Sequence, residues 1–333
     1  MSQTMIEGYR LSPQQRRVWT AGLSDHAASC VVQIKGELDT ARLREAIREV
    51  VAQHEILRTT FKLLPGMTLP VQVISDSSDF DPPVLRIDLV QRSKDEHVLS
   101  ISLPVLCADQ ESLQRLVGQI AAAYTSSSQT KSEALQYADY AEWRNELLES
   151  EAGAAGRRYW RQQDLSEVDR QKLPFEKRAD GSFQRAVQTV EISAAAGERI
   201  RTIADRTFAL ACWQLLISRL TGDSNVVVGV ACDGRKFAEL EEAIGLFSSF
   251  VPVRSEISPD LPFEKFLQQT GAQEGEARRW QEYFAWDHFF PFCFEFHKNR
   301  NLTRSPDVEF VVYEKDACAD RFKIKFVCED HGD

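Results

Sequence analysis

Between Ser100 and Leu106, polar and apolar residues alternate and then give way to an apolar run that Pro104 interrupts. This pattern predicts a buried strand that ends in a tight turn. Asp109 stands at the turn, and from Gln110 onward apolar residues recur at the spacing of an amphipathic helix. Side chains at such turns point into the cleft at the strand end of α/β folds, where chemistry is often placed. Between Leu103 and Asp109, only Asp109 ionises readily at neutral pH.

The hydrophobic pattern predicts a mixed α/β lobe over residues 1–165. Ser12 before Pro13 is typical of an N-cap followed by proline at the first helical position, so a helix is expected over Leu11–Gly22. Asp39 is placed to cap a second amphipathic helix. The other predicted elements are strands at Cys30–Lys35, Val71–Ile74, Val84–Asp88 and Glu96–Leu106, and a helix at Gln136–Glu149.

A polar stretch containing Pro174 and Gly181 follows, so residues 166–182 are predicted to link this lobe to a second one at 183–333. In the second lobe, Phe208–Leu220 is apolar nearly all round, which predicts a buried helix. The valines from Val226 predict a strand that is apolar on both faces. The other elements predicted in the second lobe are a helix at Glu264–Phe284 and strands at Val187–Ile192, Phe292–Phe296, Val308–Tyr313 and Phe322–Val327. A helix at Arg157–Gln163 is predicted in the first lobe, as the partner of Gln136–Glu149.

The 333-residue chain has a net charge of -10 at pH 7, which argues against a general surface for nucleic acid or anionic membrane. Its 43% hydrophobic and 27% charged residues are typical of a soluble globular protein. No apolar run approaches the roughly 18 residues that a membrane span needs. The first residues lack the basic start and apolar core of a signal peptide. These features predict a cytoplasmic protein.

The seven cysteines are widely spread, form no C-x-x-C pair and mostly lie in apolar runs. This distribution predicts buried thiols rather than a disulfide framework or a metal site. Cys107 lacks the cationic neighbour that would activate a nucleophilic thiol. No two of the six histidines are adjacent or four residues apart, so no metal site is expected. His288 is either a displaced general base or part of an aromatic packing cluster.

Four stretches carry recognisable motifs: L-S-P-Q-Q-R-R-V-W from Leu11, Q-H-E-I-L-R-T-T-F from Gln53, Y-A-D-Y-A-E-W from Tyr137 and I-G-L-F-S-S-F-V-P-V-R from Ile244. They are similar, in the same order, to S-x-A-Q-x-R-x-W, R-H-E-x-L-R-T-x-F, Y-x-D-Y-A-x-W and I-G-x-F-V-N-T-x-x-x-R. These motifs are those of the condensation domains of nonribosomal peptide synthetases. The chain thus resembles a condensation domain from about Leu11 to about Phe296. The resemblance implies two chloramphenicol acetyltransferase-like α/β lobes in a V-shaped pseudo-dimer, with a shortened second lobe.

The resemblance fails at the family's active-site motif, M-H-H-x-x-x-D-G. Aligned on Asp109, this chain has L-P-V-L-C-A-D-Q, so Pro104 and Val105 occupy the two histidine positions. In the family, the second histidine serves as general base or positioner when an amine attacks a thioester. Val105 can neither accept a proton nor donate a hydrogen bond. No residue is therefore assigned confidently as catalytic.

The other site residues implied by the resemblance are structural. Asp109 is expected to pair with an arginine, with Arg235 as the first candidate and Arg58 as the second. This role is favoured over that of a catalytic acid, because a carboxylate at a turn more often forms an ion pair or a cap. His54 is expected to be structural. Ser249 and Phe250 replace the asparagine and threonine of the I-G-x-F-V-N-T motif.

Two functions remain open. The first is a catalytically degenerate module that binds carrier-bound intermediates or recruits a tailoring oxygenase or hydroxylase. The second is an active acyltransferase that forms an amide or ester from a carrier-bound thioester at an atypical site, since positioning alone can lower a barrier substantially. The first is favoured because Val105 cannot take over proton transfer.

The expected partners are peptidyl or acyl carrier domains. They would present phosphopantetheine, so the chain itself is expected to bind no cofactor. Carrier domains are often acidic, and the docking face on this acidic chain would have to gather positive charge. Two candidates are Arg16 with Arg17, and the trio of Arg157, Arg158 and Arg161. The alternative is that both groups simply face solvent.

Overall fold

In the computed structural model the chain forms two compact units, and the structure describes residues 8–75, 84–125, 135–166, 168–177, 184–193, 206–285, 289–298, 302–304 and 308–330. Unit 1 consists of Met1–Gly153, Asp233–Ser248 and Arg300–Asp320. Unit 2 consists of Ala154–Cys232, Ser249–Asn299 and Arg321–Asp333. These units do not coincide with lobes taken in sequence order at 1–165 and 183–333, because two later segments belong to unit 1.

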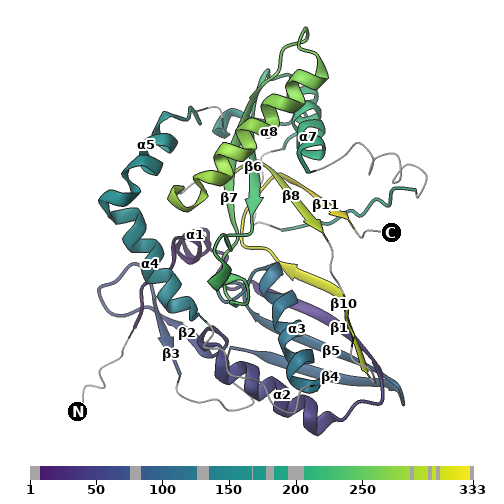
Figure 1. Ribbon diagram of the computed structural model, residues 1–333. Helices are drawn as coiled ribbons and strands as arrows, with labels where there is room; N and C mark the ends of the chain where they lie inside the picture. The colour runs from purple at the N-terminus through teal and green to yellow at the C-terminus, as the bar shows by residue number, and fades with distance from the viewer. Residues whose placement is uncertain are drawn as a thin grey trace. The chain divides into compact units, whose positions relative to one another are not determined.

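A five-stranded antiparallel sheet forms the centre of unit 1 (Figure 1). In spatial order, its strands are β4 (Arg86–Ser93), β5 (Glu96–Pro104), β1 (Ala27–Gly36), β10 (Val308–Ala317) and β9 (Leu302–Arg304). Buried and partly exposed residues alternate along β1 and β5, as expected for strands with one covered face. In Figure 1, helices α2 (Thr40–Gln53) and α3 (Gln110–Thr125) lie against this sheet.

The rest of unit 1 includes four helical segments outside the sheet, a strand pair and the capped helices α1 and α2. Ser12 caps helix α1 (Pro13–Thr20) as predicted, because its hydroxyl accepts from Gln15 N and the Gln15 side chain accepts from Ser12 N. Asp39 caps α2 through Ala41 N and Arg42 N. The remaining elements of unit 1 are the strand pair β2 (Thr59–Lys62) and β3 (Val71–Ile74), helix α4 (Tyr137–Glu149), and the 3₁₀ turns η1 (Glu55–Arg58), η2 (Glu151–Gly153) and η4 (Ala238–Leu240).

Unit 2 contains a four-stranded sheet in the order β11 (Ile324–Asp330), β8 (Phe292–Lys298), β6 (Asn225–Cys232) and β7 (Ser249–Glu256). The strands β11, β8 and β6 run parallel, and β7 is antiparallel to β6. Pro252 lies in β7, where an edge strand tolerates a missing N–H. The other elements of unit 2 are helices α5 (Ala154–Gln162), α7 (Arg206–Thr221) and α8 (Phe263–Arg279), and the 3₁₀ turns η3 (Val168–Arg170) and η5 (Gln281–Tyr283).

The core of unit 2 is rich in valine and phenylalanine. Val226, Val227, Val228 and Val230 of β6 are fully buried with Phe290, Phe292 and Phe294. Gly229 is required among them, because a Cβ there would lie 2.5 Å from the Phe290 ring. Within the described part of the chain, no helix is long and apolar enough to cross a membrane.

Two sequence predictions about unit 2 are wrong. The stretch Val187–Ile192 alternates like a strand, yet residues 184–193 have no regular secondary structure. Val187, Val190 and Ile192 are 60–79% exposed, and alternation alone does not make a strand when no neighbouring strand pairs with it. Helix α7 is not buried all round either, because Leu216 and Leu220 are 48% and 41% exposed.

Candidate functional site

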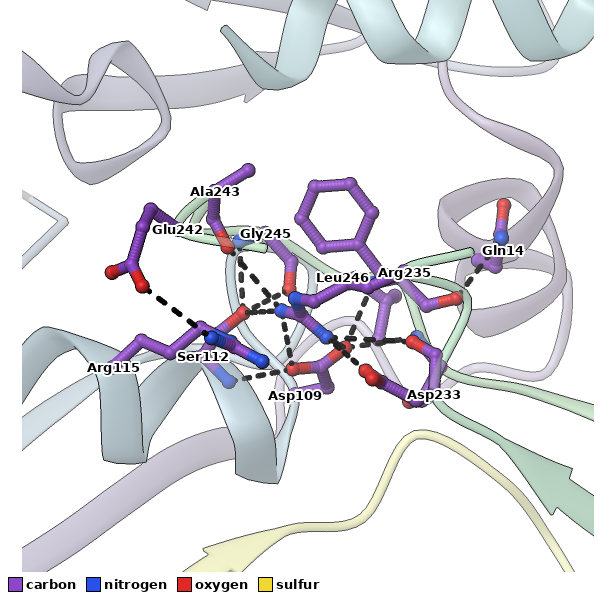
Figure 2. A network of polar contacts seen from close by, with 12 residues as sticks. Gln14, Asp109, Ser112, Arg115, Asp233, Arg235, Glu242, Ala243, Gly245 and Leu246 are labelled. Carbon is purple, nitrogen blue, oxygen red and sulfur yellow. Dashed lines mark hydrogen bonds and ion pairs between the residues drawn. The ribbon is translucent and has the colours of Figure 1, made fainter. Parts of the chain in front are cut away.

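Asp109 lies in the loop between β5 and α3 and is only 2% exposed (Figure 2). Its Oδ1 accepts from Ser112 N at 2.8 Å, in the manner of a helix cap. Its Oδ2 accepts from the backbone N–H groups of Phe247 at 2.9 Å and Ser248 at 2.8 Å. The carboxylate therefore ties the start of α3 to the segment Asp233–Ser248 of the same unit.

The predicted partner Arg235 completes this network. Its Nη2 lies 3.1 Å from Asp109 Oδ1, and its Nη1 lies 3.3 Å from Oδ2 and 2.6 Å from Asp233 Oδ1. The guanidinium also lies 4.4 Å from the centre of the Phe247 ring. Burial opposes its charged form, but the carboxylates of Asp109 and Asp233 raise the pKa of Arg235 above its usual value. Arg235 thus stays positively charged, and the carboxylates that pair with it both belong to unit 1.

Ser112 is a further member of the network that the sequence analysis did not identify. Its hydroxyl donates to Gly245 O at 2.6 Å and accepts from Gly245 N at 2.9 Å and from Arg235 Nη2 at 2.6 Å. One donor and two acceptor positions are thereby used, which is the full capacity of a hydroxyl. The signal was available in principle, since serine three residues after the loop aspartate is a polar residue on the buried side of a helix.

Tyr137 fixes the same segment from α4. Its hydroxyl donates to Leu246 O at 2.6 Å and lies 2.8 Å from Ser12 Oγ. A Cβ on Gly245 would lie 1.9 Å from the Tyr137 ring, so only glycine fits there. No local pattern in the sequence points to this hydroxyl, although Tyr137 opens one of the four motifs.

The loop that precedes Asp109 is buried and apolar. Val105, Cys107 and Ala108 have no exposed surface, and Leu106 is 2% exposed. Two backbone groups of this loop are hydrogen-bonded, because Val105 N donates to His26 O and Gln15 Nε2 donates to Leu106 O, both at 3.0 Å. Burial raises the pKa of the Cys107 thiol well above its usual range, which keeps it protonated.

The remaining predicted site residues of unit 1 lie away from Asp109. Arg58 pairs with Glu55 at 3.3 Å and donates to Ser75 O, so the second candidate partner does not join the network. His54 is 2% exposed, and its Nε2 lies 2.6 Å from Gln119 Oε1. Burial lowers the pKa of His54, as expected for a neutral structural imidazole.

Ser249 and Phe250 begin β7 in unit 2, and His288 lies outside the described residues. Arg17 forms an ion pair with Asp320 at 3.0 Å, whereas Arg158 and Arg161 on α5 are exposed. Among the residues that the structure describes, no group of three or more His, Cys, Asp or Glu side chains could hold a metal ion.

Comparison with known families decides what kind of domain this is. The family model of the condensation domain matches residues 5–84 and 80–285. The chain belongs to the condensation domain family. The motif-based resemblance is thereby confirmed.

Curated relatives of this condensation domain are synthetases. It is 27% identical over 317 residues to bacitracin synthase 3 of Bacillus licheniformis, covering 83% of this chain and 5% of the relative. It is also 25% identical over 315 residues to tyrocidine synthase 3 of Brevibacillus parabrevis, covering 83% of this chain and 5% of the relative. The chain thus spans only a small fraction of the length of these nonribosomal peptide synthetases.

Solved structures confirm the fold class. The starter condensation domain of rhizomide synthetase matches with a TM-score of 0.78 at 15% identity, covering 96% of this chain and 86% of that one. The X-domain in its complex with OxyB from teicoplanin biosynthesis matches with a TM-score of 0.73 at 22% identity, covering 98% and 85%. The condensation domain described here therefore has two mixed α/β units of the chloramphenicol acetyltransferase-like fold.

Proposed function

We propose that this condensation domain is a catalytically degenerate module of nonribosomal peptide biosynthesis, which binds a carrier-bound intermediate or a tailoring enzyme. The observation that carries the proposal is the apolar, solvent-excluded loop at the active-site position. Val105 has no exposed surface, and its side chain has no group that could move a proton.

The other groups near this loop are also poorly suited to proton transfer. The carboxylate of Asp109 already accepts five hydrogen bonds, from Ser112, Phe247, Ser248 and two nitrogens of Arg235. A base must present an unused lone pair within reach of substrate. The Cys107 thiol is fully buried and protonated. General-base catalysis typically contributes about 10²–10⁴-fold, so its loss would leave slow turnover at most.

The proposed partners follow from the family. A carrier domain would supply phosphopantetheine on its own chain, and this domain would hold no cofactor itself. A structural neighbour solved as a complex of an X-domain with OxyB makes a tailoring oxygenase or hydroxylase the first recruited enzyme to test. The exposed Arg158 and Arg161 of α5 are the docking candidates for an acidic carrier surface.

Binding and turnover are to be measured side by side. Calorimetric titration of the chain with carrier domains and tailoring enzymes encoded beside it should show saturable binding. Single-turnover assays with aminoacyl or peptidyl thioesters should show no rate above the uncatalysed one. Charge reversal at Arg158 and Arg161 should weaken carrier binding, while reversal of the exposed Arg279 on α8 should not. Absence of binding to every such partner would end the proposal.

A specific observation supports the second candidate, an acyltransferase with a relocated base. On unit 2, His297 Nε2 lies 3.1 Å from Glu295 Oε1, and Lys325 Nζ lies 2.8 Å from Glu295 Oε2. A carboxylate next to an imidazole supports a general base by stabilising the charged form of the ring, although His297 Nε2 makes no well-aligned hydrogen bond here. Thioester consumption that His297→Ala abolishes and His26→Ala leaves intact would favour this candidate over the binding module.

A further inference from the structure

Two arginines of unit 2 meet at the carboxyl end of β6. Arg206 is the first residue of α7, and Arg278 lies in the last turn of α8. Both donate through Nη2 to the same carbonyl oxygen, that of Ala231, at 2.8 Å and 2.9 Å. Two guanidinium groups that share one backbone oxygen repel each other electrostatically unless a nearby negative charge balances them.

Glu274 balances only one of the two charges. Its Oε1 lies 2.5 Å from Arg206 Nε and 3.0 Å from Arg278 Nε, and its Oε2 accepts from Thr207 Oγ1 at 3.3 Å. The Glu274 side chain is only 5% exposed, so its carboxylate interacts with these neighbours rather than with solvent. Two positive charges against one negative charge leave an excess of one positive charge.

Hydrogen-bond donors also remain. A guanidinium has five N–H donors. The hydrogen bonds above use Nη2 of each arginine and Nε of Arg278, whereas Arg206 Nε lies close to Glu274 Oε1 without a hydrogen bond. Within the described part of the chain, neither Nη1 has an acceptor. The side chains of Arg206 and Arg278 are 26% and 28% exposed, so solvent reaches the pair.

The place of the pair in the sheet also favours a ligand. The strands β6, β8 and β11 run parallel, so their carboxyl ends meet at one edge of the four-stranded sheet. Ligands of open α/β sheets bind outside the carboxyl ends of their strands. Ala231 is the penultimate residue of β6, at this edge.

We propose that Arg206 and Arg278 form an anion site that takes a phosphate group. The contacts to Glu274 and Ala231 fix both guanidinium groups before a ligand arrives, and an Arg fork matches phosphate oxygens in two-point contacts. A phosphate group offers enough acceptor oxygens for both Nη1 groups at once, and its negative charge offsets the excess positive charge.

The phosphate group has two possible sources. One is a free phosphate compound, and the other is the phosphodiester of a carrier-borne phosphopantetheine arm. The second source rests on the proposed function, whereas binding of inorganic phosphate does not. The two ideas can therefore fail separately.

The test is calorimetric titration of the full chain with inorganic phosphate at low salt. Saturable binding is expected, and Arg206→Gln and Arg278→Gln should each weaken it by about tenfold or more, since one charged donor group is lost. Arg279→Gln is the matched control, because Arg279 is adjacent on α8 but 69% exposed and 3.7 Å from Glu276. Its affinity should equal that of the unchanged chain.

Further arms make the outcome decisive. Arg278→Lys keeps the charge but loses the fork, so it should fold and still bind phosphate several-fold more weakly. Phosphopantetheine binding with no binding of pantetheine would identify the carrier arm as a source, while phosphate binding alone would identify a free compound. Three results would overturn the proposal. They are the absence of saturable phosphate binding, acetate binding as tight as phosphate binding, and a loss of phosphate affinity in Arg279→Gln equal to that in the Arg206 and Arg278 variants.

Discussion

At the scale of single residues, the buried charge of Asp109 is the feature that needs an explanation. A carboxylate that is 2% exposed loses most of its hydration, which costs several kcal/mol unless charged and polar donors replace water. Five hydrogen bonds, two of them from Arg235, supply those donors. The same bonds occupy the oxygens of the carboxylate, which favours the structural role expected for Asp109 over a chemical one.

Replacement of Asp109 by alanine should lower the free energy of unfolding by roughly 3–5 kcal/mol, because it leaves the buried Arg235 without its main counterion. Urea unfolding measures this directly. Asp233→Ala is the matched control, because Asp233 also contacts Arg235 but is 48% exposed, and it should cost about 1 kcal/mol or less. Equal effects of the two substitutions would contradict the assignment.

Gly245→Ala should lower the free energy of unfolding by about 1–3 kcal/mol, because the added Cβ overlaps the buried Tyr137 ring. The control is Gly118→Ala in α3, where a Cβ meets nothing within 4 Å. That change should instead raise stability by roughly 0.5–1 kcal/mol, because alanine favours the helix. Thermal unfolding of both variants distinguishes the two signs.

Restoring histidine at Pro104 and Val105 together should not create efficient condensation. Ser249 and Phe250 also depart from the family motif, and Val105 lies in a site with no exposed surface. Placing two imidazoles there strands polar groups in an apolar loop. The assay is dipeptide formation from carrier-bound substrates. Rapid product formation would mean that the histidines alone were missing.

At the scale of elements, periodicity predicted most helices and strands because one face of each packs against a core. Helix α3 follows its predicted apolar stripe, and β5 alternates up to Pro104. The strand prediction for Val187–Ile192 is wrong because alternation describes only the order of polar and apolar residues. It does not show that another strand is available to pair with the segment. The Asp109–Arg235 pair was accessible through motif resemblance, but the hydroxyls of Ser112 and Tyr137 depend on tertiary contacts that no local pattern encodes.

The strand pair β8 and β11 carries a titratable group with a predictable pH effect. Burial opposes the charged form of Glu295, yet Lys325 and His297 hold the pKa of this carboxyl at about 2, below its usual 4.5. A depressed pKa in the folded state stabilises the protein above about pH 4.5, and this stabilisation is lost as the pH falls towards 2. It amounts to on the order of 3 kcal/mol at most.

Lys325→Met should therefore raise the pKa of Glu295 and move the acid loss of stability to higher pH. Urea unfolding between acidic and neutral pH, with carboxyl NMR of Glu295, measures both. Lys323→Met is the control, because its ion pair with Glu176 is about one-third exposed and should contribute little. If the free energy of unfolding of the Lys325 variant fell with decreasing pH over the same range as that of the unchanged chain, this explanation would be wrong.

At the scale of the whole molecule, the seven cysteines give a readout of packing. All are thiols, five of them buried, while Cys212 is exposed and Cys328 is half-buried. Burial raises the pKa of Cys30 to about 12, so such thiols are both inaccessible and protonated. The prediction of buried thiols thus holds for five positions but not for Cys212, which lies on the outer side of α7.

A thiol reagent at mildly alkaline pH should label Cys212 first, Cys328 more slowly and the other five only after unfolding. Mass spectrometry of digested samples assigns each site. Cys212→Ser should remove the fast phase and leave the protected set unchanged. Rapid labelling of Cys107 in the native protein would show that the loop before Asp109 opens.

The pairing of β1 with β10 has a consequence for synthesis on the ribosome. Gly36 pairs with Val308, so one edge of β1 stays without its neighbour while roughly 270 residues are translated, which takes on the order of 10–60 seconds. During that time the nascent strand Ala27–Gly36 can pair with β5 on one side only, and its other edge is a template for strands of other chains. The sheet whose first strand is synthesised earliest is thus among the last to be completed. Chaperones that shield strand edges are therefore needed most before Val308 has been synthesised.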